Sequence, residues 1–243
     1  MRQRLDLELI ARGLFESRAK ARAAIEAGTV RVNGAVAARP ADLIDDDATI
    51  FATPAHPWVG RGGVKLVHAL ALWPVVVAGR TVLDVGASTG GFTQVCLSRG
   101  AAKVFAVDVG HGQLHDSLRR DSRVVVLEGL DARSLTRATI ADAIDLIVTD
   151  VSFISLAKAL PAALALAEPG ADLIALVKPQ FEAGPEAVGK GGLVRDPAAR
   201  DAALASVAAF LEASGWPVQA NTPSPIQGAD GNHEWLLWAR RAG

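Results

Sequence analysis

The sequence predicts an α/β protein in which a doubly wound, mostly parallel sheet with an antiparallel final strand follows a small α+β domain. From residue 60 onward, short apolar runs alternate with helical patterns, as they do when helices cover both faces of a parallel sheet. Residues 1–51 instead combine two short helical patterns with a hairpin signal. We therefore expect domains at residues 1–51 and 60–243, joined by a proline-containing linker at residues 52–59.

The amino-terminal elements follow from local capping and turn signals. The first helical pattern ends at Gly13, and Ser17 is placed to cap a second helix, which Gly28 closes. Asn33-Gly34 is the strongest short signal for a hairpin, so we expect it to join two short strands. An acidic turn then leads to a last strand that ends at Phe51.

The larger domain is expected to alternate short apolar strands with helices. The expected strands are residues 81–85, 103–108, 123–127, 145–149, 171–177, 218–222 and 234–240. The expected helices are residues 64–72, 91–99, 112–120, 155–167 and 197–213. Residues 182–196 are rich in glycine and proline, and we expect a mobile loop there.

Charge is distributed unevenly along the chain. The formal net charge of the 243 residues is −1, so the whole molecule has no basic field that would indicate nucleic acid. Residues 1–40 differ, because eight Arg and Lys against four Asp and Glu give a local charge of +4 (8 − 4). An ordinary solvated surface explains this excess as well as an RNA-binding face does.

Several classes of protein are disfavoured by composition. Cys96 is the only cysteine, so a disulfide or a thiolate metal site within one chain is excluded. The histidines show no spacing typical of metal ligands, and we expect no metal. There is no signal-peptide pattern, and the longest charge-free stretch near the middle, residues 66–79, is shorter than the ~20 residues of a membrane helix. We therefore expect a cytoplasmic protein without membrane contact.

A glycine-rich turn between a strand and a helix indicates a Rossmann-like cofactor site at residues 81–92. The dinucleotide fingerprint would place glycine where this chain has Ser88, and no Lys-Ser/Thr pair follows Gly91 as a P-loop requires. Asp84 precedes the turn, and Asp108 ends the next strand 24 residues on (108 − 84). Asp108 is placed to bind ribose hydroxyls. Asp84 can pair with the cationic amine of a ligand but would repel a pyrophosphate, which favours S-adenosyl-L-methionine over NAD.

A third acid, Asp131, follows the next strand at the same sheet edge. It is placed to accept a hydrogen bond from the adenine amino group, although it can instead merely cap a turn. The candidate cofactor-binding residues are Asp84, Gly86, Ser88, Thr89, Gly90, Gly91, Phe92, Asp108 and Asp131. The alternative is a tight strand-to-helix turn that binds no ligand.

Four charged residues on separate segments form the candidate catalytic set. Lys65 lies near the start of a helix, Asp150 and Lys178 follow predicted strands, and Glu234 opens the last strand. Ligands of open α/β sheets bind outside the carboxyl ends of the parallel strands. Because the last strand is expected to be antiparallel, its start lies at that same edge, and we expect the four residues to converge. Any one of them alone would be an ordinary charged residue at a strand end.

Two lysines and two carboxylates beside S-adenosyl-L-methionine predict methyl transfer to a hydroxyl. A sugar hydroxyl is a poor nucleophile until its proton is removed, and a lysine can remove it where burial and a cationic neighbour lower a lysine pKa toward ~7–8. Lys178 is the candidate base, and Lys65 supplies the neighbouring positive charge. Asp150 and Glu234 would orient the ammonium groups and the hydroxyl.

These motifs resemble the TlyA family over nearly the whole chain. Arg4-Leu5-Asp6, Ser17-Arg18 and the segment Gly28–Gly34 are similar to S-four-type RNA-binding domains. The Gly-Ala-Ser-Thr-Gly-Gly-Phe run at residues 86–92 and the Lys-Pro-Gln-Phe-Glu run at residues 178–182 are the most specific matches.

The resemblance implies a ribosomal RNA 2′-O-methyltransferase with an FtsJ-like catalytic domain, which acts on cytidines and has ribosomal RNA or ribosomal subunits as partner. It assigns the family's Lys-Asp-Lys-Glu tetrad to Lys65, Asp150, Lys178 and Glu234. The RNA-binding residues that it implies are Arg4, Ser17, Arg18, Lys20, Arg22 and Arg31. Two positions depart from the family pattern, since Asp131 stands where Asn is expected and Trp58 where Tyr is common.

Two other classes of function stay open. One is a non-catalytic RNA-binding ribosome-assembly factor, which the intact tetrad argues against. The other is a membrane-active haemolysin, a name that some family members carry, although no amphipathic or spanning segment supports it. A base methyltransferase is disfavoured because Asp150 precedes Val-Ser-Phe rather than a Pro-Pro-aromatic loop. The modified nucleotide, the ribosomal subunit and the oligomeric state are not specified by the sequence.

Overall fold

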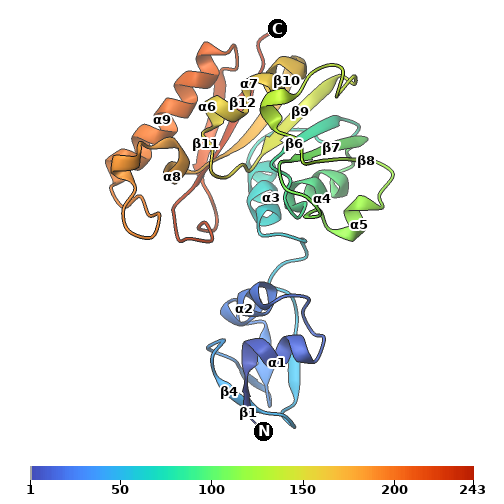
Figure 1. Ribbon diagram of the computed structural model, residues 1–243, viewed down its shortest axis with the longest axis vertical. Helices are drawn as coiled ribbons and strands as arrows, with labels where there is room; N and C mark the ends of the chain where they lie inside the picture. Colours follow the sequence, from blue (N-terminus) through green and yellow to red (C-terminus); the bar gives the residue numbers. More distant parts are fainter. Residues whose placement is uncertain (1) are drawn as a thin grey trace. The chain divides into compact units, whose positions relative to one another are not determined.

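The computed structural model describes residues 2–243 and divides into two compact units, Met1–Pro57 and Trp58–Gly243. The small unit packs helices α1 (Leu5–Ala11) and α2 (Arg18–Glu26) with two short sheets (Figure 1). Its strands are β1 (Arg2–Arg4), β2 (Val30–Val32), β3 (Ala35–Val36), β4 (Leu43–Asp45) and β5 (Ile50–Ala52). The sheets have the orders β1-β4 and β3-β2-β5.

The capping and turn signals of the small unit work as expected. The Ser17 hydroxyl accepts a hydrogen bond from the Lys20 N–H at 3.3 Å and so caps α2. Asn33 and Gly34 have φ values of +50° and +85°, the left-handed backbone that a tight hairpin between β2 and β3 requires. Strands β1 and β4 were not expected, because neither is next to a hairpin signal such as the Asn33-Gly34 turn that marks β2 and β3.

The large unit is built on a seven-stranded sheet with the order β11-β12-β10-β9-β6-β7-β8 (Figure 1). Its strands are β6 (Thr81–Val85), β7 (Lys103–Asp108), β8 (Val124–Glu128), β9 (Ile144–Thr149), β10 (Ala167–Val177), β11 (Val218–Pro223) and β12 (Trp235–Arg240). Strands β8, β7, β6, β9 and β10 pair in parallel, whereas β12 is antiparallel to both of its neighbours. This confirms the predicted fold class, including the antiparallel final strand.

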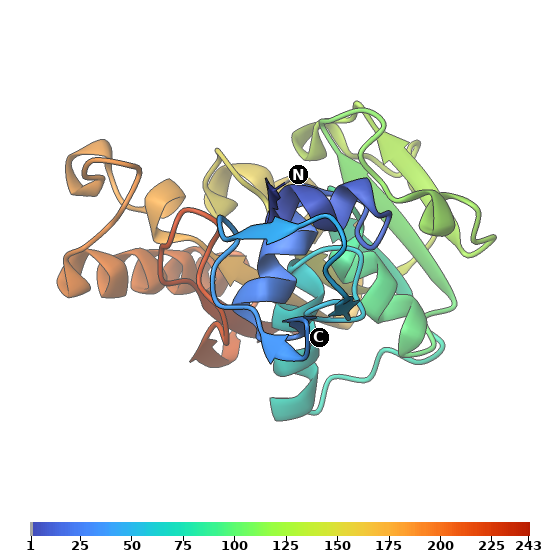
Figure 2. The ribbon, with the colours of Figure 1, turned by 90° about the horizontal axis from the view of Figure 1, so that it is seen from below.

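Helices cover both faces of this sheet (Figures 1 and 2). On one face lie α3 (Gly62–Leu72), α4 (Gly91–Ser98) and α5 (Asp116–Arg119), and on the other α6 (Leu156–Ala159), α7 (Pro161–Leu166) and α9 (Pro197–Ala213). Side chains alternate between two cores along the strands, so Val82 packs with the first group of helices and Leu83 with the second. The short helices α8 (Pro179–Glu182), η1 (Ala132–Ser134) and η2 (Pro185–Ala187) follow strand ends or lie in loops.

Two expected helices differ from the structure. The helix expected at residues 112–120 is reduced to α5, because the Glu128 carboxylate accepts the backbone N–H groups of Gly112, Gln113 and Leu114 at 2.8–2.9 Å. The helix expected at residues 155–167 is divided into α6 and α7, because Pro161 has no N–H to continue a helical ladder.

Candidate active site

The glycine-rich turn lies at the carboxyl edge of the sheet, directly after β6. Gly86 has φ +83°, and a Cβ there would stand 3.1 Å from the Asp150 carbonyl oxygen, so only glycine fits. Ser88 also adopts a left-handed φ of +48°. Its N–H donates to Asp108 Oδ2 at 2.8 Å, which ties the turn to the end of β7.

A cavity of about 570 Å³ opens beside this turn, over the ends of β6, β7 and β9. Its walls combine Gly86, Ser88, Asp108 and Asp131 with apolar side chains, among them Val109, Leu130, Val151 and Ile154. Besides Ser88, the Asp108 carboxylate accepts the Gly110 N–H at 2.7 Å, and it still has lone pairs to offer a hydroxyl. A carboxylate for a ribose and apolar walls for an adenine ring fit S-adenosyl-L-methionine.

Asp131 both lines this cavity and caps a turn. Its carboxylate accepts the backbone N–H of Arg133 at 2.9 Å and pairs with the Arg133 guanidinium at 2.6 Å. Hydrogen bonds from the Arg133 side chain, above all, lower the pKa of Asp131. The carboxylate therefore stays ionised and able to accept a further hydrogen bond.

Asp84 lies beneath the turn rather than on the cavity wall. It is fully buried, and its Oδ2 accepts a hydrogen bond from Thr93 Oγ1 at 2.6 Å. Burial raises the pKa of Asp84 to about 7. Gly90 is also turned into the core, where a Cβ would meet Leu118 Cδ1 at 2.2 Å. These two predicted residues shape the turn from behind.

A second cavity of about 220 Å³ joins the turn to the candidate catalytic residues. Its lining includes five residues of the turn and three polar residues that follow strands. These are Gly86, Ser88, Thr89, Gly91 and Phe92 of the turn, with Asp150, Ser152 and Lys178. Because Gly86, Ser88, Asp150 and Ser152 line both cavities, the two spaces adjoin.

The four candidate catalytic residues form two close ion pairs. Lys65 Nζ lies 2.5 Å from Glu234 Oε2, and Lys178 Nζ lies 2.6 Å from Asp150 Oδ1. The Lys178 ammonium directs its hydrogen bond to Ser152 Oγ at 2.8 Å, so its contact with Asp150 is an ion pair without hydrogen-bond geometry. Lys65, Lys178 and Glu234 are buried, with 6%, 9% and 4% of their surfaces exposed.

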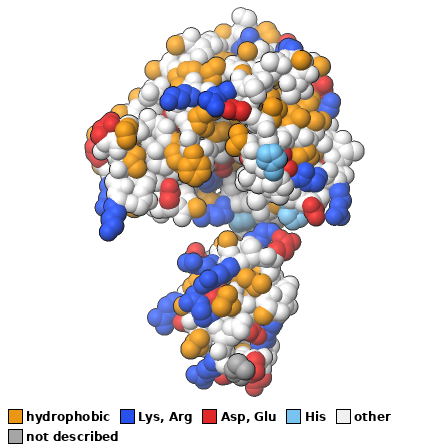
Figure 3. All heavy atoms as spheres, in the orientation of Figure 1, with side chains coloured by type: hydrophobic (Ala, Val, Ile, Leu, Met, Phe, Trp, Pro, Cys, Tyr) orange, Lys and Arg blue, Asp and Glu red, His pale blue; other side chains and the backbone are white. Residues whose placement is uncertain are grey.

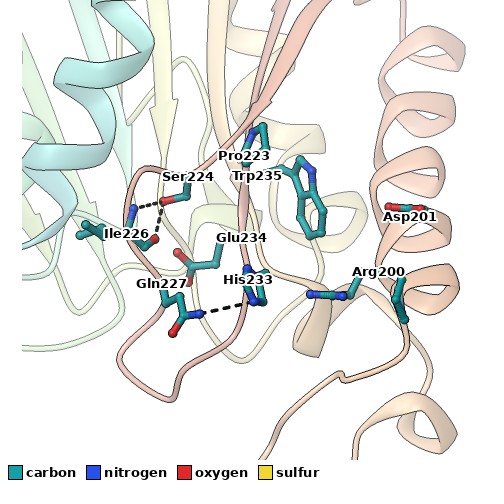
Figure 4. Close-up of a pocket in the computed structure, with 10 residues that line it drawn as sticks. Arg200, Asp201, Pro223, Ser224, Ile226, Gln227, His233, Glu234 and Trp235 are labelled. Atoms are coloured by element: carbon teal, nitrogen blue, oxygen red, sulfur yellow. Dashed lines mark hydrogen bonds between the residues drawn. The ribbon is translucent and has the colours of Figure 1, made fainter.

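Burial dominates the electrostatics of Glu234. It raises the pKa of this carboxyl, and the positive charge and hydrogen bond of Lys65 oppose the shift. The charges of Asp150 and Lys178 also act on Glu234, which places the two ion pairs within electrostatic reach of each other. Figure 4 shows that Glu234 also lines a third cavity, of about 190 Å³, together with His233, Gln227 and Arg200.

Two functional candidates at this edge were missed from the sequence. Ser152 is the hydrogen-bond partner of Lys178. Phe153 is 91% exposed, has φ +66° and lies against Phe181, with ring centroids 5.2 Å apart. Their sequence signal is their place in the segment at residues 150–155, which follows β9 and resembles the TlyA family.

The predicted RNA-binding residues lie on the small unit, where Lys and Arg side chains gather on the face seen in Figure 3. Arg4 and Arg18 both pair with Asp6, and Lys20 pairs with Glu16 at 2.5 Å. Arg22 lies 4.0 Å from Glu26, and Arg31 donates to the Gly34 carbonyl at 3.2 Å. Ser17 serves as the cap of α2.

Comparisons with known proteins agree with this architecture. Residues 58–241 match the FtsJ-like methyltransferase family, and residues 3–50 match the S4 domain. The 16S/23S rRNA (cytidine-2′-O)-methyltransferase TlyA of Mycobacterium tuberculosis strain H37Rv is 49% identical over 98% of this chain and 90% of its own length. Hemolysin A of Brachyspira hyodysenteriae is 41% identical over 96% of this chain and 98% of its own.

A solved structure matches nearly the whole chain. A Streptococcus thermophilus protein, whose name includes the word hemolysin, matches with a TM-score of 0.79 at 39% identity and covers 99% of this chain and 89% of its own. Within residues 2–243, we find no helix of the length and hydropathy that crossing a membrane requires. The chain therefore belongs to the TlyA family of ribosomal RNA 2′-O-methyltransferases, which join an S4 domain to an FtsJ-like domain and use S-adenosyl-L-methionine as methyl donor.

Proposed function

We propose that this enzyme methylates the 2′-hydroxyl of a cytidine in ribosomal RNA, either naked or within a ribosomal subunit, in the cytoplasm, with Lys178 as general base. One observation carries the proposal. The buried Lys178 amine lines the small cavity beside the glycine turn, where Ser152 and Asp150 hold it. That is where a hydroxyl must lie to meet a methyl group presented from the larger cavity.

The geometry distinguishes the two lysines. Lys178 lines the small cavity that adjoins the cofactor cavity. Lys65 does not line the small cavity, and its ammonium group is paired with Glu234. Lys65 is therefore the neighbouring positive charge, and Lys178 is the group that reaches the substrate. This assignment gives both carboxylates an orienting role.

When bound, S-adenosyl-L-methionine supplies an electrophilic methyl group on a sulfonium sulfur. Lys178 Nζ, in its neutral amine form, accepts the proton of the ribose hydroxyl as the oxygen takes the methyl group. Asp150 and Ser152 hold Nζ at the cavity wall and stabilise the ammonium that forms. Fixing the hydroxyl in line with the methyl group supplies much of the remaining rate.

The cofactor contacts are assigned by the chemistry of each cavity wall. We assign Asp108 to the ribose hydroxyls and Asp131 to the adenine amino group, because both carboxylates line the larger cavity. Gly86, Ser88, Thr89, Gly91 and Phe92 form the turn against which the methionine portion lies. Asp84 and Gly90 support that turn from the core.

The remaining assignments concern the domains. We propose an RNA-binding domain at residues 1–51, a linker at residues 52–59 and a catalytic domain at residues 60–243. The RNA-binding domain would contact ribosomal RNA through its basic side chains, most of which keep part of their guanidinium or ammonium group exposed. Although both are ion-paired, the Arg18 side chain is 50% exposed and the Arg22 side chain 54% exposed.

The nucleoside is assigned to a groove that adjoins the cofactor cavity. A hollow of about 760 Å³ is lined by Phe153 and Phe181 together with Arg133, Lys158 and Gln180. Phe153 also lines the cofactor cavity, so its ring stands at the junction of the two spaces. Unstacked bases of RNA bind aromatic faces, and cationic side chains bind the flanking phosphates.

Replacing Phe153 by alanine is expected to raise the KM for RNA about 5- to 150-fold, because one base–aromatic stack is worth about 1–3 kcal/mol. Stability should stay near that of the wild type, since the ring is 91% exposed. Steady-state methylation kinetics with RNA as the varied substrate provide the measurement. Phe153→Tyr should retain the KM, and Val76→Ala, another exposed apolar side chain, is the control. An unchanged KM in Phe153→Ala would contradict the stacking role.

The proposed function as a whole is tested by product analysis. Tritium is transferred from S-adenosyl-L-methionine to 16S and 23S ribosomal RNA, either naked or in subunits, and the RNA is digested to nucleosides. We expect label in 2′-O-methylcytidine. Label in a base-methylated nucleoside would contradict the proposal. If no label is transferred while the cofactor still binds, the alternative of a non-catalytic RNA-binding protein is favoured. In a separate assay, leakage of lipid vesicles caused by the purified protein would favour membrane lysis.

A further inference from the structure

A buried carboxylate joins two arginines on the small unit. Asp6, in the first turn of α1, has no exposed surface. Its Oδ1 and Oδ2 accept hydrogen bonds from Arg4 Nε and NH2 at 3.0 Å each, and Oδ2 accepts a third from Arg18 Nε at 2.9 Å. The side-chain hydrogen bonds of Arg4, above all, lower the pKa of Asp6 to about 2, so this carboxylate is ionised.

The two arginines come from different elements and reach the carboxylate from outside. Arg4 ends β1 and precedes α1, whereas Arg18 is the first residue of α2. Their side chains remain 40% and 50% exposed, while that of Asp6 is covered. Among residues 2–243, Arg4 NH1 and both terminal nitrogens of Arg18 have no hydrogen-bond acceptor. Each guanidinium is thus fixed at one edge and open to solvent at the other.

The fixed orientation of the two guanidinium groups favours the binding of a phosphate. A guanidinium held in one orientation presents paired N–H groups to phosphate oxygens at a smaller loss of side-chain freedom on binding. A carboxylate also weakens the positive field of a surface, so its presence between two arginines opposes long-range attraction of RNA. Asp6 can therefore contribute to RNA binding by orienting the two guanidinium groups and not through the net charge of the surface.

We propose that Asp6 is a positioning residue that holds Arg4 and Arg18 as a fork for one phosphodiester of the RNA. The proposal rests on the proposed RNA-binding role of this unit and adds the geometry by which it binds. Asp6 itself does not touch the RNA. Its carboxylate sets the spacing and orientation of the two guanidinium groups that do.

The sign of the effect of Asp6→Asn separates positioning from electrostatics. The substitution removes one negative charge, so electrostatics alone predicts tighter RNA binding. We expect weaker binding instead, by at least about five-fold, because two arginine side chains lose their fixed orientation. Affinity is measured with labelled 16S and 23S ribosomal RNA transcripts and no cofactor. Glu26→Gln removes the same charge from an exposed residue only loosely paired with Arg22, and it should bind as tightly as the wild type or more tightly.

A second variant covers the case in which Asp6→Asn unfolds the small unit, which circular dichroism would reveal. Arg18→Lys keeps the positive charge but removes the Nε donor and the planar fork. It should also bind at least about five-fold more weakly, whereas Arg39→Lys, at an exposed arginine of the small unit outside the predicted RNA-binding set, should bind like the wild type. Wild-type affinity in Arg18→Lys, or in a folded Asp6→Asn, would overturn the proposal. Failure of the wild-type protein to bind either transcript would overturn the proposed RNA-binding role and this inference with it.

Discussion

Replacing Lys178 by arginine is expected to abolish methylation while leaving S-adenosyl-L-methionine binding within a few-fold of the wild type. Arginine keeps the positive charge beside Asp150, but its guanidinium does not lose a proton in proteins and so cannot act as a base. Removing a positioned general base typically costs ~10²–10⁴-fold in rate. Lys178→Ala should lose activity to a similar extent. Methyl transfer is followed by single turnover with tritiated cofactor, and cofactor affinity by titration calorimetry.

The pair of variants separates two roles of the same side chain. If Lys178 acted only by its charge, the arginine variant would retain most of the activity and the alanine variant would not. Lys190→Ala, at an exposed loop position, is the matched lysine control and should behave like the wild type. Loss of cofactor binding together with activity would instead mean that Lys178 supports the cofactor site or the fold.

Replacing Lys65 by methionine is expected to lower the free energy of unfolding of the large unit by about 3–5 kcal/mol, because it leaves the Glu234 carboxylate buried without its partner. Methylation should be lost as well. Urea unfolding followed by tryptophan fluorescence measures the change, since all five tryptophans lie in the large unit.

The loss of stability in Lys65→Met should depend on pH in a defined direction. Burial already raises the pKa of Glu234 above its usual 4.5, and removing Lys65 removes the main opposing influence. The folded carboxyl then keeps its proton over a pH range in which the unfolded one has lost it. Stability therefore falls as the pH rises from 4.5 through the raised pKa of Glu234. The difference from the wild type should be smallest near pH 4.5 and largest at neutral pH.

A double variant tests whether the cause is the unpaired charge. Lys65→Met combined with Glu234→Leu should recover most of the lost stability, since a buried ion pair can often be replaced by apolar side chains at little cost. It should not recover methylation. A double variant as unstable as Lys65→Met, or a loss of stability that does not vary with pH, would show that the packing of the Lys65 stem matters more than the pair.

The sequence was sufficient to predict the edge of the sheet at which the four candidate catalytic residues lie. Asp150 and Lys178 each follow an apolar run, and parallel strands end at a common edge, so their convergence required no knowledge of side-chain contacts. Glu234 could be added because the last strand was expected to be antiparallel. The pairing within the four residues could not be predicted, because it depends on rotamers and on the packing of α3 against the sheet.

The contacts and the exposure of individual side chains were the main source of error. The sequence places Glu128 at the end of a strand. It does not show that the Glu128 carboxylate accepts hydrogen bonds from three backbone N–H groups, which prevents a helix at residues 112–114. Asp84 was expected to face the cofactor, yet the alternation of side chains along β6 directs it into the core with Thr93. Phe153 was missed because an exposed aromatic residue and a buried one look the same in sequence.

The order of the strands in the sheet determines how much of the chain must be synthesised before the large unit can be completed. Strand β12 is the last strand in the chain but lies between β10 and β11, so β11 cannot join the sheet before residues 235–240 have been synthesised. Glu234 arrives with the same segment and meets Lys65, its partner 169 residues earlier. A nascent chain that still holds these residues in the ribosomal exit tunnel has neither a complete sheet nor the Lys65–Glu234 ion pair. Synthesis through residue 240 is thus a prerequisite for both the seven-stranded sheet and the Lys65–Glu234 pair.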